Sequence, residues 1–171
     1  MEFYGNYGYV NTKNTYTFTN QPLSELTTIT RWDGNVTHSM RVTNEYNANS
    51  GLLMKQIHSF DNCPYPTAEY TYDDLGRVTM ISRHNNKLFS SYSHNLRGDL
   101  TAVSSDYMWT KPLFSENIHY TDPEEFATFN GNICAIDWSI HNPQTNNIEN
   151  FPSAYRYDGM NRLTEGIFFG T

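Results

Sequence analysis

Ten residues near the middle of the chain read Tyr70-Thr71-Tyr72-Asp73-Asp74-Leu75-Gly76-Arg77-Val78-Thr79. The alternating start is typical of a β-strand. Asp73 can accept hydrogen bonds from backbone N–H groups two residues on, which starts a turn. Gly76 can take the left-handed conformation that lets the next strand begin, and Val78 then returns to the core. This stretch therefore predicts a β-hairpin.

The same pattern occurs four times in the chain. Each copy begins with an aromatic ring, Asp or Asn follows at once, and an aliphatic residue comes six positions after the ring. In three copies another Tyr stands two residues before the ring, and residues two apart on a strand share a face of the sheet. We therefore interpret the four segments as stacked hairpins with stripes of Tyr rings. The segments are Tyr46–Leu52, Tyr72–Val78, His94–Leu100 and Tyr157–Leu163, and the earlier Tyr residues are Tyr70, Tyr92 and Tyr155.

Strand-like stretches separated by Asn and Gly turn signals fill the rest of the chain. Short connections join sequence neighbours into antiparallel hairpins, so the predicted fold class is all-β, with hairpins stacked into a curved or spiralling sheet. We expect one short turn of helix at Asp122–Phe126, a strand at Tyr16–Thr19, and longer loops at Asp61–Pro66 and His141–Asn150. No shift in composition marks a boundary, which predicts a single domain over residues 1–171. The repeats cover about 40–169, and the strands of 1–39 are less repeat-like.

Composition excludes several classes of protein. The 171 residues carry a net charge of −7, which argues against nucleic acid as a partner. No apolar run approaches the ~20 residues of a membrane-spanning helix, and the first residues are not those of a signal peptide. Aromatic residues reach 15%, too many for a disordered chain. What remains is an acidic, β-rich protein.

The repeated segments resemble the YD repeat of bacterial Rhs proteins, wall-associated proteins and teneurins. Residues 70–79 and 155–164 match best, and 96–101, 112–120 and 129–133 with Trp138 resemble an Rhs-type variant. The resemblance implies hairpins that spiral into a hollow shell, enclosing a toxin or forming an extracellular surface. Asp122-Pro123 does not match the self-cleavage region of toxin-carrying relatives. We expect a fragment or a short member of the family, located extracellularly or at the cell surface.

Candidate catalytic residues are scarce. The six histidines form no metal-binding pattern, and the adjacent pairs Asp73-Asp74 and Glu124-Glu125 point to opposite faces of a strand. Cys63 and Cys134 can bridge in an oxidising compartment, but we favour two separate buried thiols. The sequence thus predicts a non-enzymatic protein without cofactor or metal. The residues assigned a structural role in the repeat are Tyr46, Tyr70, Tyr72, Asp73, Gly76, Arg77, Tyr92, His94, Arg97, Gly98, Tyr155, Tyr157, Asp158 and Arg162.

Two functions follow from this sequence. The first is a scaffold whose partners are other YD repeats, of the same or a larger protein, and which can form homo-oligomers through its sheet edges because unpaired strand edges invite pairing. The alternative is a module that binds a glycan or another surface molecule through exposed aromatic rings. Trp32, Trp109 and Trp138 are the candidates for such a face, because they lie outside the repeated Tyr positions.

Overall fold

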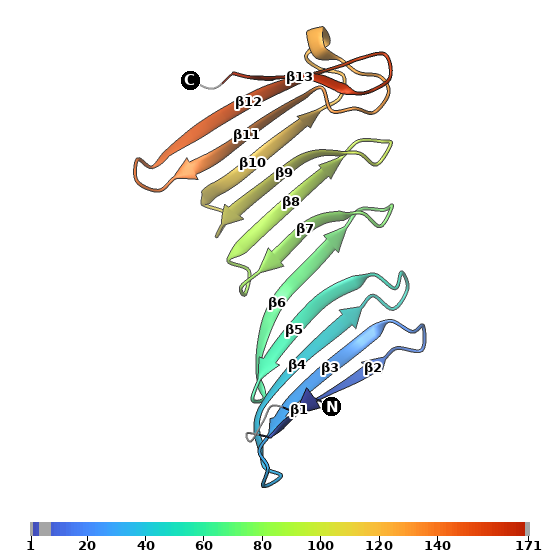
Figure 1. Ribbon diagram of the computed structural model, residues 1–171, viewed down its shortest axis with the longest axis vertical. Helices are drawn as coiled ribbons and strands as arrows, with labels where there is room; N and C mark the ends of the chain where they lie inside the picture. The colour runs from blue at the N-terminus through green and yellow to red at the C-terminus, as the bar shows by residue number, and fades with distance from the viewer. Residues whose placement is uncertain (1, 4–7, 170–171) are drawn as a thin grey trace. The chain divides into compact units, whose positions relative to one another are not determined.

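The computed structural model describes residues 2–3 and 8–169, which form antiparallel strands and one short helix (Figure 1). The chain divides into two compact units, Met1–Asn86 and Lys87–Thr171. The all-β fold class is confirmed. The single domain expected over 1–171 stays a prediction.

In the first unit every strand pairs antiparallel with its neighbours in sequence. The pairing places Met40 opposite Phe60 and Tyr70 opposite Ile81. Because the connections are short, each strand returns beside the one that it follows. The strands of this unit are β1 (Glu2–Phe3), β2 (Tyr9–Tyr16), β3 (Pro22–Thr30), β4 (Val36–Tyr46), β5 (Leu53–Phe60), β6 (Cys63–Tyr72) and β7 (Val78–Arg83).

The second unit repeats this arrangement with one longer connection. Residues between β10 and β11 contain the 3-10 helix η2 (Glu124–Phe126), which confirms the single helical turn expected there. All other neighbours in this unit follow one another through tight turns. Its strands are β8 (Leu88–His94), β9 (Leu100–Tyr107), β10 (Lys111–His119), β11 (Ala135–Asn142), β12 (Asn147–Tyr157) and β13 (Leu163–Phe168).

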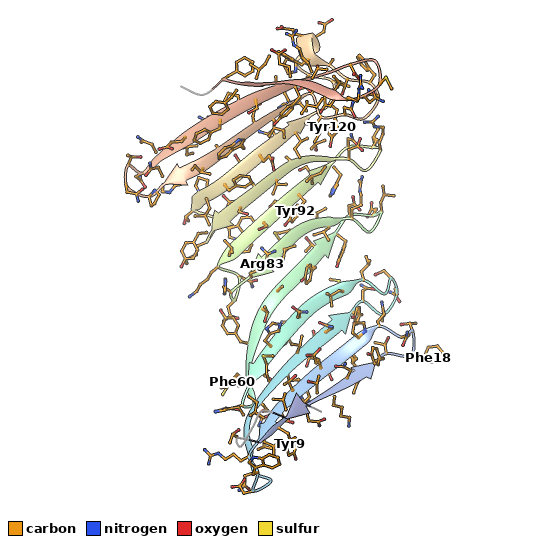
Figure 2. The ribbon with its side chains drawn as sticks, in the orientation of Figure 1. Tyr9, Phe18, Phe60, Arg83, Tyr92 and Tyr120 are labelled. Carbon is orange, nitrogen blue, oxygen red and sulfur yellow. The ribbon has the colours of Figure 1, made fainter. Side chains whose placement is uncertain are left out.

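Burial is sparse in both units. Among the described residues only a few apolar side chains are buried, and most of them are small: Ala68, Phe89, Cys134, Ala135 and Ala154. One packed cluster joins Cys134, Ala135 and Ala154, and Phe126 of η2 lies against it. Many large apolar side chains on the strands and turns are exposed to solvent, and Phe18 at the tip of the β2–β3 turn is an example (Figure 2). Ladder hydrogen bonds, cross-strand pairs and hydrogen-bonded turns therefore carry more of the stability than a central core does.

The strand expected at Tyr16–Thr19 is wrong, because β2 ends at Tyr16 and a turn follows. The Thr17 N–H donates to the Gln21 carbonyl oxygen at 2.8 Å, and the Gln21 N–H donates to Thr17 Oγ1 at 3.0 Å. Asn20 adopts φ 63° in the same turn. Local side-chain bonding therefore overrides the alternating pattern at this point.

The loop expected at Asp61–Pro66 is also wrong, because β6 begins at Cys63. Only Asp61 and Asn62 connect it to β5, with φ values of 46° and 65° that are typical of a two-residue hairpin turn. The two prolines of the expected loop, Pro64 and Pro66, lie on the strand beside Ser59 and Ile57. A register shift follows Pro66, so the strand accommodates both prolines next to an irregularity.

The loop expected at His141–Asn150 is mostly strand as well. β11 runs to Asn142 and β12 begins at Asn147, so only residues 143–146 connect them. Asn142 Oδ1 accepts hydrogen bonds from the N–H groups of Gln144 and Thr145 at 2.9 and 3.3 Å. The run of Asn therefore builds one tight turn and the strand that follows it.

Candidate functional site

The repeated segment centred on Asp73 forms a tightly hydrogen-bonded turn. Asp73 Oδ1 accepts from the N–H groups of Leu75 and Arg77, both at 2.9 Å. The Asp73 N–H donates to the Arg77 carbonyl oxygen at 2.9 Å, and the Gly76 N–H donates to the Asp73 carbonyl oxygen at 3.0 Å. Gly76 has φ 78°, a left-handed conformation that glycine adopts without steric cost.

The same turn recurs at Asn95–Asp99 and at Asp158–Arg162. Asn95 Oδ1 accepts from the N–H groups two and four residues on, at 2.9 and 3.0 Å, and Asp158 Oδ1 does the same at 2.9 and 3.0 Å. In the Asp158 turn the left-handed residue is Asn161, with φ 61°, and Gly159 is not left-handed. The fourth copy, at Asn47–Leu52, is one residue longer, with Gly51 at φ 70°.

A salt bridge strengthens three of these turns. Arg77 Nε lies 2.6 Å from Asp73 Oδ2, Arg162 Nε lies 2.7 Å from Asp158 Oδ2, and Arg97 Nη2 lies 2.8 Å from Asp99 Oδ2. The Arg77 backbone N–H, together with the guanidinium group, lowers the pKa of Asp73. The Arg162 backbone N–H lowers the pKa of Asp158 in the same way. In the middle turn the main cause is a hydrogen bond from the Asn95 side chain, which lowers the pKa of Asp99.

The aromatic residue before the turn ties neighbouring strands together. At four positions a Tyr hydroxyl donates to a backbone carbonyl oxygen, which belongs to the first residue of the preceding strand in three cases and to a residue just before β11 in the fourth. Burial raises the pKa of Tyr72, Tyr120 and Tyr157, so these phenols stay protonated donors. The four bonds are Tyr46 to Pro22 (2.9 Å), Tyr72 to Leu53 (2.7 Å), Tyr120 to Leu100 (3.0 Å) and Tyr157 to Ile133 (2.8 Å). We call this combination of ring residue, hydroxyl bond and following turn the ring-and-turn unit.

Tyr120 was missed as a ring residue by the spacing argument. It lies just after β10, beside the long connection, with no turn-forming Asx directly after it (Figure 2). The signal that could have found it is the Rhs-type stretch 112–120, which ends at this Tyr.

The other predicted structural residues lie at the same end of the strands. His94 occupies the ring position of the β8–β9 hairpin, opposite Leu100, and Gly98 has φ 94°. Of the earlier Tyr residues, Tyr92 pairs with Val103 and Tyr155 with Gly166. The Tyr155 ring lies close to that glycine: a Cβ atom placed on Gly166 would be 3.8 Å from the ring, an ordinary van der Waals contact. The roles assigned to these residues stay predictions.

The turn of the unit also occurs where the sequence looks less repeat-like. At Arg31–Asn35 the Arg31 N–H donates to the Asn35 carbonyl oxygen at 2.9 Å, and Gly34 has φ 84°. The turn at Thr17–Gln21 has the same bonds. In the sequence these two turns are marked only by Asp33-Gly34 and by Asn20. Their first residues, Arg31 and Thr17, are not the Asp or Asn that begins the other copies.

The three tryptophans lie in different elements. Trp32 is in the turn after β3 and is 58% exposed. Trp109 is in the turn after β9, and its ring centroid is 3.9 Å from that of Phe89. Trp138 on β11 stacks on Phe151 with the centroids 4.2 Å apart, so one face of its indole is covered. Glycan binding by these residues stays a prediction.

Neither cysteine forms a disulfide. Cys134 is buried, as expected, and burial raises the pKa of its thiol. Cys63 is exposed, so the expectation of two buried thiols is wrong for it. Cys63 is the first residue of β6, directly after a two-residue turn, where little covers a side chain.

The described residues contain no group of three or more His, Cys, Asp or Glu side chains placed to hold a metal ion. The His119 ring lies between two carboxylates, with Nδ1 2.8 Å from Asp122 Oδ2 and Nε2 2.9 Å from Asp137 Oδ2. Within the part of the chain that the structure covers, no helix has the length and apolar character to cross a membrane.

The long β10–β11 connection packs over the end of β12. Arg156 lies over the Phe126 ring, with its guanidinium carbon 5.0 Å from the centroid, and Arg156 Nη2 lies 3.0 Å from Glu125 Oε1. Phe169 contacts Phe126 edge-on, with the ring centroids 6.5 Å apart. This corner contains the packed cluster of the second unit.

Comparison with known proteins gives a likeness of fold. No family model and no curated protein matches the sequence. A chain in the crystal structure of TcdB2-TccC3-Cdc42 covers 95% of this chain with a TM-score of 0.63 at 15% identity. A chain of a Tc holotoxin pore from Photorhabdus luminescens covers 96% at a TM-score of 0.49 and 14% identity, a similarity too low to argue from. This chain spans 9–11% of the length of those chains. The likeness to the first supports the Rhs/YD-repeat type of fold.

Proposed function

We propose that this chain is a non-enzymatic structural β-domain, a stretch of wall in an Rhs or YD-repeat protein located outside the cell or at its surface. The observation that carries the proposal is the ring-and-turn unit. At Tyr46, Tyr72 and Tyr157 it joins a hairpin to a neighbouring strand by a local set of hydrogen bonds. Such nearest-neighbour links let hairpins be added in series without a central core.

The exposed surface of the strands supports this role. Residues of an ordinary enzyme domain are organised around a hydrophobic core and a concave site, whereas the described strands here bury few side chains. The likeness of fold to a TcdB2-TccC3 toxin chain supports a toxin-related or surface context. In that context the partners of this chain are other YD repeats, of its own protein or of a larger one.

The test combines stability with turnover on the purified full chain. We expect Tyr72→Phe and Tyr120→Phe to lower the free energy of unfolding by about 1 kcal/mol each, because each removes one partly buried hydrogen bond. Tyr107→Phe is the matched control, since Tyr107 is 42% exposed on β9. Panels of esters, glycosides, peptides and phosphate esters should show no turnover.

Turnover that is lost in His119→Ala or Asp137→Asn, while the circular dichroism spectrum is unchanged, would contradict the proposal. Those two side chains contact each other, with His119 Nε2 2.9 Å from Asp137 Oδ2. If Tyr72→Phe and Tyr120→Phe are as stable as the control Tyr107→Phe, the hydroxyl bonds do not stabilise the sheet, and the proposal loses its main support.

A further inference from the structure

We propose that Asn130, in the long β10–β11 connection, is a site of spontaneous deamidation. In this reaction the backbone nitrogen of Gly131 attacks the side-chain amide carbon of Asn130, and the amide nitrogen leaves as ammonia. The inference goes beyond the proposed structural function and does not depend on it. It rests on the residue that follows Asn130, on the hydrogen bonds of its side chain and on its exposure.

Gly131 is the first reason to single out Asn130. The chain contains 20 Asn residues, and Asn130 is the one that precedes a glycine. A Cβ atom on the following residue hinders the approach of its backbone nitrogen to the amide carbon, and glycine has no Cβ. Among the described atoms, a Cβ added at Gly131 would meet only Arg97 Nη2 within 4 Å, at 3.9 Å. The attacking nitrogen is therefore open to approach, with a cationic group nearby.

The backbone at this point is not fixed by secondary structure. Asn130 and Gly131 are exposed and lie outside the strands and the helix η2. The connection is held on one side at Thr128, whose N–H donates to the Tyr120 carbonyl oxygen at 2.8 Å, and on the other side at Cys134. Among the described residues no acceptor receives a hydrogen bond from the Gly131 N–H. The rotations that bring its nitrogen to the amide carbon therefore cost no bond of that N–H.

The amide that is attacked already has a donor at its oxygen. The Asn132 N–H donates to Asn130 Oδ1 at 3.1 Å. Attack at the amide carbon moves negative charge to this oxygen, so a donor held there stabilises the tetrahedral intermediate. The structure thus combines an open nucleophile with a polarised carbonyl group in one exposed segment.

Water is the co-reactant, and hydroxide drawn from it is the base. Hydroxide removes the proton of the Gly131 N–H, the nitrogen forms a bond to the Asn130 amide carbon, and the bond from that carbon to Nδ2 breaks. Nδ2 takes up a proton from water and leaves as ammonia, and a five-membered succinimide remains. Water then opens the succinimide at either carbonyl and yields an aspartyl or an isoaspartyl residue. No oxidation or reduction occurs.

The products differ from Asn130 in charge, hydrogen bonding and length. Asn130 Nδ2 donates to Asn161 Oδ1 in the β12–β13 turn, whereas a carboxylate at the same place has no donor. The isoaspartyl form also adds a methylene group to the backbone of the connection. Deamidation therefore removes the donor of a side-chain bond between the connection and that turn.

The test is incubation of the purified full chain at mildly alkaline pH, followed by digestion and fragmentation mass spectrometry. Asn130 should gain the mass difference between an amide and a carboxylate before any other Asn does, at a rate that rises with hydroxide concentration. Asn146 is the matched control within the chain, since it is exposed in the β11–β12 turn but precedes Asn147. It should react roughly tenfold more slowly, because the Cβ of Asn147 hinders the attack.

Two variants and an unfolded sample sharpen the result. Gly131→Ala should slow the reaction at Asn130 roughly tenfold, and Asn130→Gln should lose it, because the longer side chain closes a less favourable ring. Circular dichroism shows that each variant is folded. Reaction at Asn130 no faster than at Asn146 would overturn the inference. A native rate far below that in concentrated urea would overturn it as well, because the fold would then protect Asn130.

Discussion

Two connections in the second unit follow the same kind of ring residue and are built differently. Tyr157 is followed by the five-residue turn Asp158–Arg162, whose side chains satisfy its own backbone. Tyr120 is followed by residues 121–134, which form the long connection to β11 and contain η2. In both cases the Tyr hydroxyl donates a hydrogen bond to a backbone carbonyl oxygen, that of Leu100 for Tyr120 and that of Ile133 for Tyr157.

The difference shows that the Asx-led turn can be replaced while the ring and its hydroxyl bond are kept. The ring and its hydroxyl bond are present at both connections, whereas the Asx-led turn is replaced at one of them. The long connection compensates through packing, because Phe126 lies against Cys134, Ala135 and Ala154. A local hydrogen-bond pattern and a small apolar cluster are thus alternative ways to end a hairpin here.

The largest expected effect is on the packed connection. Phe126→Ala should lower the free energy of unfolding by about 2 kcal/mol, below the range for fully buried Phe because this ring is half-buried. Urea unfolding followed by tryptophan fluorescence measures it. Phe129→Ala in the same connection is the control, since Phe129 is 84% exposed. An equal cost for the two would mean that the cluster does not hold the connection.

Glycine substitution separates the two connections by backbone conformation. Gly131, in the long connection, has φ 92°, so Gly131→Ala should cost about 1–2 kcal/mol from left-handed strain. Gly159 in the Asp158 turn has no such φ and no atom within 4 Å of an added Cβ. Gly159→Ala should therefore change stability by less than about 0.5 kcal/mol. Thermal unfolding by circular dichroism compares them, and a larger loss for Gly159→Ala would reverse the argument.

The hydroxyl bonds should contribute equally at the two connections. Tyr157→Phe and Tyr120→Phe should each lower the unfolding free energy by about 1 kcal/mol, because both lose one hydrogen bond to a backbone carbonyl. Since folding raises the pKa of both phenols above the ordinary 10.0, this stability is present below pH 10.0 and is lost as the pH rises through the folded values. Alkaline titration monitored by circular dichroism tests it. Loss at one connection only would show that the two rings are not equivalent.

The smallest effect is acid sensitivity of the tight turn. Folding lowers the pKa of Asp158, so its contribution is present above the ordinary value of 3.8 and is lost as the pH falls through the lower folded value. Asp158→Asn keeps the Oδ1 acceptor and removes the charge, and it should flatten this dependence. Amide hydrogen exchange in residues 158–162 at low pH provides the measurement. An unchanged acid profile in the variant would assign the sensitivity to another group.

The turns were predictable from sequence because their bonds are local. Asp73 and Asp158 mark them through a side chain that bonds N–H groups two and four residues on, so identity and spacing suffice. The prolines of β6 and the Asn residues at the start of β12 are typical of loops, but they lie on strands because pairing with a neighbouring strand overrides local preference. Tyr120 was missed for a related reason. Its acceptor lies 20 residues earlier, and no short pattern encodes that distance.

The sparse burial of the strands has a thermodynamic consequence. The large heat-capacity change of an ordinary domain comes from apolar surface that unfolding exposes to water. Here most strand side chains already touch water, so that change should be small for the length of the chain. A small heat-capacity change flattens the dependence of stability on temperature. Because each hairpin depends mainly on its neighbours, melting should begin at exposed edge strands and proceed inward instead of occurring in a single all-or-none step.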